Sequence, residues 1–336
     1  MQLNVEFEAS TRSATLKIGT TAVSVVRDLF VDPASDADKR KLFKTCVKRV
    51  NIELSSYCNR RCGFCPNKEG TRLKAHHILP RSIFESVIAN LEVINYRAGL
   101  YFHLYNEPLA DPDLLIERAS HARSRLPDAK FGLNSNGDYL TQELLTRLDG
   151  AGINDIFVSV YGPNQGDWVE DYVRERVVDI AARIGLKTTL NEKPGMQYSI
   201  SGRVGNVAIN VAARNLWKSG YDRGMLIPEL SVTRTSPCVS PITDVSIDYR
   251  GYMLPCCNVY TDNPSHIPNT FANLSDVQIF DAYANSRAQS WRRDLLQFDP
   301  PGSFCRNCSR SNHQSLDTPA NRETLMHLRR NMQLAD

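Results

Sequence analysis

Three cysteines near residue 60 form the most informative pattern in the chain. They are spaced Cys58-x3-Cys62-x2-Cys65 and follow residues 50–54, whose alternating side chains predict a strand. Three thiolates can hold three irons of a 4Fe–4S cluster and leave the fourth iron open for a chelating ligand. A ferredoxin-type site would need a fourth cysteine, and a zinc site would usually pair two Cys-x2-Cys elements. The triplet therefore favours an open cluster over both alternatives.

Four more cysteines are candidates for a second metal site: Cys238, Cys256, Cys305 and Cys308. Residues 242–248 and 252–254 predict a hairpin that closes at Cys256, and the Cys305-x2-Cys308 pair follows a helix predicted over 277–297. Four thiolates from split pairs commonly hold structural zinc, and they can equally hold an iron–sulfur cluster. Chemistry alone leaves both metals open.

The last two of the nine cysteines are harder to interpret. Cys257 adjoins Cys256, and two neighbouring residues are poorly placed to bind one cluster. Cys257 is therefore either a small buried residue or a reactive thiol. Cys46 precedes the strand at 50–54 and is expected to pack in the core. An odd cysteine count without a signal peptide argues against a secreted disulfide framework.

Composition excludes several classes of protein. The 336 residues carry 40 Lys and Arg against 37 Asp and Glu, a net charge of +3, which is too even for a nucleic-acid-binding surface. No apolar run approaches the roughly 20 residues of a membrane helix. We therefore expect a cytoplasmic protein with no nucleic-acid and no membrane partner.

The middle of the chain alternates between strand and helix patterns, which predicts βαβ units and a parallel sheet. About 180 residues are too few for a closed barrel of about 250, so an open or partial barrel is expected. The expected strands are 50–54, 101–104, 130–133, 156–161, 186–190 and, more weakly, 229–233; the expected helices are 81–96, 112–125, 141–148 and 167–184.

Three parts are expected along the chain. Residues 1–47 read as a β-rich N-terminal extension, with strands at 3–7 and 14–18. Residues 48–234 hold the barrel, and residues 235–336 form a small α+β domain built around the second cysteine group and ending in a helix at 318–333.

The cysteine triplet, with Phe64 before its last cysteine, resembles the signature of radical S-adenosylmethionine (SAM) enzymes. Other motifs occur in the order and at the strand ends where that family carries them, although the glycine pair before the family's Glu-Pro is replaced here. These motifs are Tyr105-Asn106-Glu107-Pro108-Leu109, Asn134-Ser135-Asn136-Gly137, Ser159 and Ser201-Gly202-Arg203-Val204-Gly205-Asn206.

The C-terminal pattern is similar to the twitch domain, the shorter form of the SPASM auxiliary-cluster domain. Cys238 is followed by a gap of 12 residues, a glycine, four residues and Cys256, and later by the Cys-x2-Cys pair. This likeness favours a cluster over zinc and implies a partial (β/α)6 barrel with a small auxiliary-cluster domain.

The resemblance implies two 4Fe–4S clusters and SAM as cofactors. Cys58, Cys62 and Cys65 would hold the SAM cluster, and Cys238, Cys256, Cys305 and Cys308 would hold the auxiliary cluster. The residues expected to bind SAM are Phe64 near the adenine; Asn106, Glu107 and Pro108 near the methionine amino group; and Asn136, Ser159 and Arg203.

The expected activity is hydrogen abstraction by a 5′-deoxyadenosyl radical from a small polar metabolite such as a sugar, aminocyclitol or nucleoside. Dehydrogenation in natural-product biosynthesis is the first expectation, with a flavodoxin or ferredoxin as electron donor. Epimerisation, decarboxylation and modification of a ribosomal peptide are alternatives within the family. In an epimerase, Cys257 would be the hydrogen-atom donor to the substrate radical. A zinc-stabilised α/β binding protein is the alternative that is not an enzyme, and it would leave the triplet unexplained.

Overall fold

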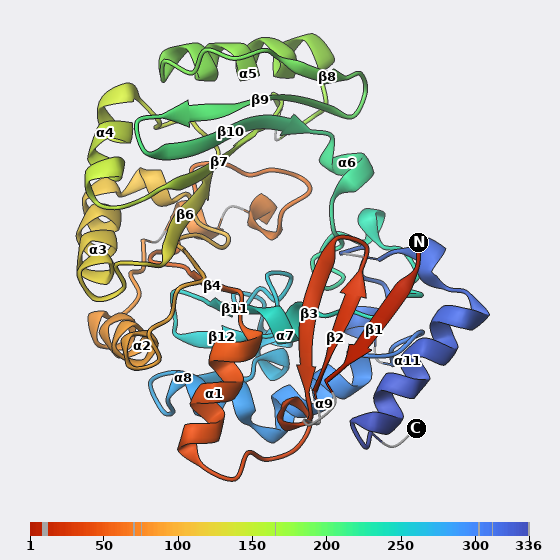
Figure 1. The fold of residues 1–336 in the computed structure, drawn as a ribbon. Helices are drawn as coiled ribbons and strands as arrows, with labels where there is room; N and C mark the ends of the chain where they lie inside the picture. Colours follow the sequence, from red (N-terminus) through yellow and green to blue (C-terminus); the bar gives the residue numbers. More distant parts are fainter. Residues whose placement is uncertain are drawn as a thin grey trace. The chain divides into compact units, whose positions relative to one another are not determined.

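The computed structural model describes residues 1–8, 13–69, 71–74, 76–164, 166–301, 303–310 and 312–334 (Figure 1). The chain divides into two compact units. Unit 1 comprises Met1–Arg49, Tyr221–Ser246 and Tyr252–Asp336, and unit 2 comprises Val50–Gly220 and Ile247–Gly251. Within the described residues, no helix is long and apolar enough to cross a membrane.

Unit 2 is an α/β unit in which four strands are each followed by a helix. The order is β4 (Arg49–Ile52), α2 (Arg81–Val93), β5 (Gly99–Tyr101), α3 (Pro112–Arg125), β6 (Lys130–Ser135), α4 (Gln142–Gly150), β7 (Asp155–Val160) and α5 (Glu170–Arg183). The β5–β6 and β6–β7 pairs are parallel, and Figure 1 shows the four helices along one side of the sheet. The predicted βα units are confirmed.

Local sequence explains where these helices begin. Asp111 accepts a hydrogen bond from the Leu114 amide at the start of α3, with Pro112 as the first helical residue. Thr141 caps α4 in the same way through the Leu144 amide. Each helix therefore begins just beyond a loop that leaves the carboxyl edge of the sheet.

The chain after α5 differs from the prediction. The expected parallel strands at 186–190 and 229–233 are absent, because the described chain instead forms an antiparallel meander and a short 3-10 turn over Pro228–Leu230. The meander consists of β8 (Asn191–Lys193), β9 (Gln197–Val204) and β10 (Val207–Arg214), and β10 pairs parallel to β7. The physical reason is that Gly195 and Gly205 adopt positive φ angles of 72° and 58° and reverse the chain.

Unit 1 contains a small antiparallel sheet, a second group of short strands and several helices. The elements are β1 (Leu3–Phe7), β2 (Ser13–Ile18), β3 (Thr21–Val26), α1 (Asp36–Cys46), α7 (Ser240–Thr243), β11 (Asp244–Ile247), β12 (Tyr252–Leu254), β13 (Ala272–Asn273), α8 (Ile279–Ala284), α9 (Ser286–Leu295), α10 (Ser303–Arg306) and α11 (Pro319–Asn331). A short helix, α6 (Leu216–Ser219), lies at the end of unit 2. The structure confirms the strands predicted at 3–7, 14–18, 242–248 and 252–254 as β1, β2, β11 and β12, and the helix predicted at 318–333 as α11.

The N-terminal segment belongs to the same unit as the C-terminal region and is not a separate extension. The Leu3 amide donates to Asn321 Oδ1 at 2.9 Å, and the Asn321 amide nitrogen donates to the Met1 carbonyl at 3.1 Å. Phe43 packs edge-on against Phe280 and Tyr283. A three-stranded sheet buries too little apolar surface alone, and these contacts complete its core.

The single helix predicted over 277–297 is two helices, α8 and α9, divided at Asn285. Asn285 is extended at ψ 164°, and its side chain accepts from the Ala288 amide and donates to the Phe271 carbonyl. Asparagine competes with the helix for backbone hydrogen bonds and so starts a new helix here. Arg292 of α9 is only 1% exposed and donates to three carbonyls.

Candidate active site

The cysteine triplet lies in the loop that leaves the carboxyl end of β4. Cys62 is buried, Cys58 and Cys65 are half-buried, and the Cys65 amide donates to the Cys62 carbonyl at 3.0 Å. Burial raises the pKa of Cys58 and of Cys62 to about 12. A metal binds cysteine as the thiolate, and three neighbouring thiols on one loop are a donor set that fits a cluster.

The loop after β5 carries Asn106, Glu107 and Pro108 to the same edge of the sheet. The Glu107 amide donates to the Tyr57 carbonyl at 2.8 Å, which ties this loop to the residue before Cys58. The Asn106 side-chain nitrogen is buried and has no partner among the described residues. An unpaired buried donor costs free energy unless a ligand satisfies it, so this atom fits an anionic group such as the SAM carboxylate.

The Glu107 carboxylate is buried and largely satisfied within the protein. It accepts from the Ser135 hydroxyl at 2.8 Å, the Asn136 amide at 2.6 Å and the Leu109 amide at 3.0 Å. Burial raises its pKa to about 7, although these donors oppose the rise. One lone-pair direction remains for a further donor, and a bound ammonium group would favour the ionised form.

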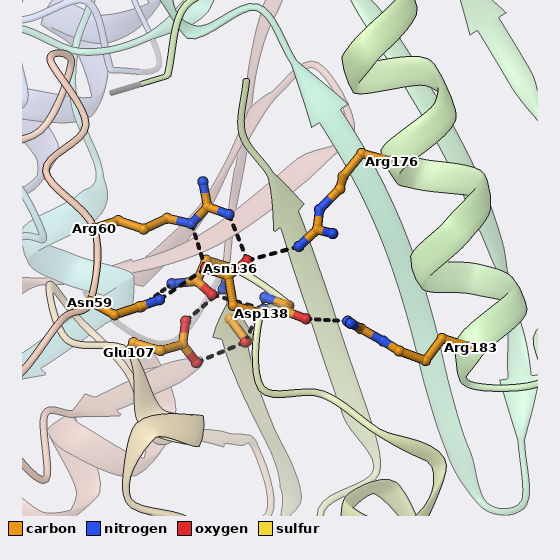
Figure 2. A network of polar contacts seen from close by, with 9 residues as sticks. Asn59, Arg60, Glu107, Asn136, Asp138, Arg176 and Arg183 are labelled. Atoms are coloured by element: carbon orange, nitrogen blue, oxygen red, sulfur yellow. Dashed lines mark hydrogen bonds and ion pairs between the residues drawn. The ribbon is translucent and has the colours of Figure 1, made fainter. Parts of the chain in front are cut away.

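A polar network connects the cysteine loop to the carboxyl end of β6 and to α5, with Asp138 at its centre (Figure 2). Asp138 accepts two hydrogen bonds from Arg60, at 2.6 and 2.7 Å, one from Arg176 at 3.0 Å and one from Asn59 at 2.9 Å. Asn136 donates to Asn59 at 2.7 Å. Asn59 and Arg60 lie between the first two cysteines, so this network fixes the conformation of the cluster loop.

The Asp138 network should contribute measurably to stability. Burial alone would raise the pKa of Asp138, but Arg60 reverses the effect and the pKa lies below its ordinary value. Asp138→Asn should lower the free energy of unfolding by about 2 kcal/mol, between the values for exposed and buried ion pairs. Because the folded-state pKa is lowered, this difference is present at neutral pH and shrinks as the pH falls through the acidic range.

Urea unfolding of wild type and variant at several pH values measures this difference. Asp113→Asn is the matched control, because it breaks the Arg147–Asp113 pair, whose side chains are 46% and 84% exposed, and it should have little effect. Equal stability of the Asp138 and Asp113 variants would show that the network does not hold the loop.

Phe64 and Ser159 lie near one aromatic cluster in unit 2. Phe64 is buried, with Tyr161 at 5.3 Å and Trp217 at 6.0 Å between ring centroids, and Ser159 is hydrogen-bonded to the Tyr161 side chain. A Cβ at Gly166 would lie 2.5 Å from the Phe64 ring, so only glycine permits this close approach. The sequence analysis did not identify Tyr161 and Trp217 as residues of this cluster.

Arg203 is the one expected SAM-binding residue that does not join this group. It lies near the β9–β10 turn, its side chain is exposed, and it donates to the Asn206 carbonyl. That turn lies beside the start of β7, where Ala208 pairs with Asp155, and hence at the edge opposite the cysteine loop. The physical reason is that residues 201–204 end β9 and Gly205 and Asn206 form the hairpin turn, so their likeness to a family motif does not carry Arg203 to the site.

The second cysteine group lines one cavity in unit 1. Cys238, Cys256, Cys305 and Cys308 surround it together with Arg234, Asn258 and Arg310. Burial raises the pKa of Cys256, Cys305 and Cys308. The four thiols line one space, as the ligands of a single cluster must.

No three described His, Cys, Asp or Glu side chains converge as ligands of a single ion. In a 4Fe–4S cluster each thiolate binds its own iron, so its ligands need not meet at one point. The arrangement is therefore compatible with a cluster.

Cys257 is not part of the cavity lining that the structure describes. Its sulfur accepts from Arg310 Nη1 at 2.7 Å, and Arg310 also bonds to Asp244 and Ser240. Asn258, the next residue, is buried and donates to the Cys308 sulfur at 3.1 Å. Cys257 and Asn258 lie in a turn, and their adjacent side chains face different surroundings.

Comparisons with known proteins agree with this geometry. A model of the "Radical SAM superfamily" matches residues 52–191, and a SPASM model, "Iron-sulfur cluster-binding domain", matches residues 238–309. The chain belongs to the radical SAM superfamily, in the branch with an auxiliary-cluster domain. It is a radical SAM enzyme whose cofactors are two 4Fe–4S clusters and SAM.

One relative and two solved structures are informative. The relative is an S-adenosyl-L-methionine-dependent 2-deoxy-scyllo-inosamine dehydrogenase of Niallia circulans, 23% identical over 265 residues that cover 77% of this chain and 92% of that protein. Among solved structures, BtrN in complex with AdoMet and 2-DOIA matches with a TM-score of 0.57 and 19% identity over 80% of this chain and 95% of that chain. An open conformation of BtrN matches with a TM-score of 0.53 and 18% identity, covering 82% and 96%. The structural likeness shows a shared fold.

Proposed function

We propose that this enzyme dehydrogenates a small polar metabolite of the aminocyclitol class, converting a C–OH group to a carbonyl. The observation that carries the proposal is the four-cysteine cavity, because oxidation needs a place to deliver an electron. The similarity to a 2-deoxy-scyllo-inosamine dehydrogenase supports the same substrate class. Flavodoxin or ferredoxin is the proposed electron donor.

When bound, SAM and its reduced cluster supply a hydrogen-abstracting 5′-deoxyadenosyl radical, and the auxiliary cluster supplies a one-electron acceptor. The substrate carbon loses a hydrogen atom, and the substrate then loses the hydroxyl proton and one electron. Two electrons and two hydrogens leave, so the balance is that of alcohol oxidation.

The protein's own residues would orient SAM at the carboxyl edge of the sheet. Cys58, Cys62 and Cys65 are the proposed cluster ligands, and Cys238, Cys256, Cys305 and Cys308 are those of the auxiliary cluster. We assign the unpaired Asn106 amide to the methionine carboxylate and the Glu107 carboxylate, preceding Pro108, to its amino group. Phe64 is assigned to the adenine, and Asn136 and Ser159 to the ribose side.

Redox-neutral chemistry such as epimerisation would require a hydrogen donor for the substrate radical. The sequence suggests Cys257 as this donor. Its sulfur accepts a hydrogen bond from Arg310, however, and Cys257 is not among the residues that line the cavity. We therefore favour oxidation, in which Cys257 has no catalytic role.

The test is an anaerobic assay of reconstituted enzyme with SAM, a reductant and 2-deoxy-scyllo-inosamine. We expect a product lighter by two hydrogens and one 5′-deoxyadenosine per product. Cys257→Ala should keep most of the wild-type rate, with Cys257→Ser as the control that retains a polar partner for Arg310. An inactive Cys257→Ala variant, together with solvent deuterium at the reacting carbon of the wild-type product, would overturn dehydrogenation in favour of epimerisation.

A further inference from the structure

The auxiliary-cluster cavity contains an arginine that no acidic side chain pairs among the described residues. Arg234 is 1% exposed and lines the cavity with the four cysteines. Its Nη1 donates to the Ser236 carbonyl at 3.3 Å and its Nη2 to the Arg310 carbonyl, whereas its Nε is buried without a partner in the described chain. Two backbone carbonyls thus hold the guanidinium in place, and one donor remains unused.

Arg234 lines the same cavity as the four cysteines and is almost fully buried. Little solvent therefore screens its charge from the sulfurs. Arg310 also lines the cavity, but its guanidinium is engaged by Cys257, Asp244 and Ser240. Asp222 is buried nearby and accepts from the Met225 amide at 3.1 Å, yet it is not among the cavity-lining residues. Arg234 is therefore a buried cation of the cavity lining that forms no close ion pair with a described acidic side chain.

Hydrogen bonds to sulfur add to this effect. Asn258 donates through its side chain to Cys308 at 3.1 Å and through its amide to Cys256 at 3.4 Å, and the Arg310 amide donates to Cys308 at 3.4 Å. Asn258 is oriented by Arg223, which donates to its side-chain oxygen at 3.3 Å. The donors gather on Cys256 and Cys308.

We infer that Arg234, assisted by Asn258, raises the reduction potential of the auxiliary cluster. The higher potential makes the cluster a better electron acceptor. Reduction adds one negative charge inside a desolvated cavity. A fixed cation and N–H groups aimed at sulfur stabilise the more negative state more than the oxidised one. The purpose of this tuning, to take the substrate's electron, rests on the proposed function, whereas the potential itself does not.

The test is a redox titration, followed by electron paramagnetic resonance, of the full-length enzyme with both clusters. Bound SAM distinguishes the signals, because it binds only the first cluster. Arg234→Gln should lower the reduction potential of the auxiliary cluster by at least about 59 mV, which corresponds to a tenfold change in the equilibrium constant of a one-electron reduction. Arg234→Lys keeps the charge and should recover part of the shift.

Arg306→Gln is the matched control, since Arg306 lies between Cys305 and Cys308 but is exposed. Arg306→Gln removes one positive charge, as Arg234→Gln does, but solvent screens the charge of Arg306 from the cluster. The reduction potential of the auxiliary cluster should therefore stay near the wild-type value. A wild-type potential in Arg234→Gln would overturn the inference. If Arg234→Gln binds no auxiliary cluster, Asn258→Leu is the second test. The auxiliary potential of Asn258→Leu should be lower than in the wild type, and an unchanged value would overturn the inference. Failure of the proposed function appears separately, as absence of the oxidised product with the shift intact.

Discussion

Replacing Cys58, Cys62 and Cys65 together with alanine should abolish 5′-deoxyadenosine formation and leave about four of the roughly eight irons expected from two 4Fe–4S clusters. The three thiols lie on one loop after β4, and no other described cysteine belongs to that loop. SAM would then lose the iron that chelates it, and no electron could reach its sulfonium. Iron and sulfide analysis after anaerobic reconstitution, with chromatography of the nucleoside products, measures both effects.

Cys46→Ala is the control for this triple variant. Cys46 is also a buried cysteine, but its sulfur donates to the Ser24 carbonyl in unit 1, and burial raises its pKa to about 12. The variant should therefore keep both clusters and the nucleoside product, at some cost in stability from the lost side-chain volume. One zinc and about four irons in the wild type would contradict the auxiliary cluster while leaving the SAM cluster in place.

Local sequence signals predicted the part of the fold that positions the first cluster. Each of β4 to β7 is a short strand with buried apolar residues, and α3 and α4 begin at capping residues that the sequence displays, Asp111 and Thr141. The cysteine spacing identified all seven proposed ligands, and the structure places three on one loop and four around one cavity.

Features that depend on pairing between distant residues were not predictable from one sequence. Asp138 and Arg60 are 78 positions apart, and nothing in either segment indicates that they form an ion pair. The β9–β10 hairpin was missed because residues 201–206 were interpreted as a binding motif, although Gly205 also permits a tight turn. No motif around Arg234 indicates that it lies beside the cysteines, because its role follows only from the cavity that it lines.

Replacing Cys305 and Cys308 with alanine should preserve SAM cleavage and remove product formation. The two residues belong to the auxiliary cavity of unit 1, whereas the cysteine triplet and its supporting network lie in unit 2. The variant should hold about four irons and still release 5′-deoxyadenosine, because radical formation needs only the first cluster. Without an acceptor for the second electron, the substrate radical has no route to the carbonyl product. Parallel quantification of nucleoside and oxidised product measures the separation.

Loss of fold is the confounding outcome, since metal ligands also stabilise small domains. The structure offers independent anchors for this loop: the Val232 amide donates to the Asn307 carbonyl at 3.1 Å, and the Arg234 amide donates to the Arg306 carbonyl at 2.7 Å. Alanine at 305 and 308 removes neither bond, so a native circular dichroism spectrum is expected. Arg306→Gln, on the same loop and exposed, should keep both clusters and full product formation. A folded Cys305 and Cys308 variant that makes product at the wild-type rate would show that the auxiliary cluster does not accept the substrate's electron.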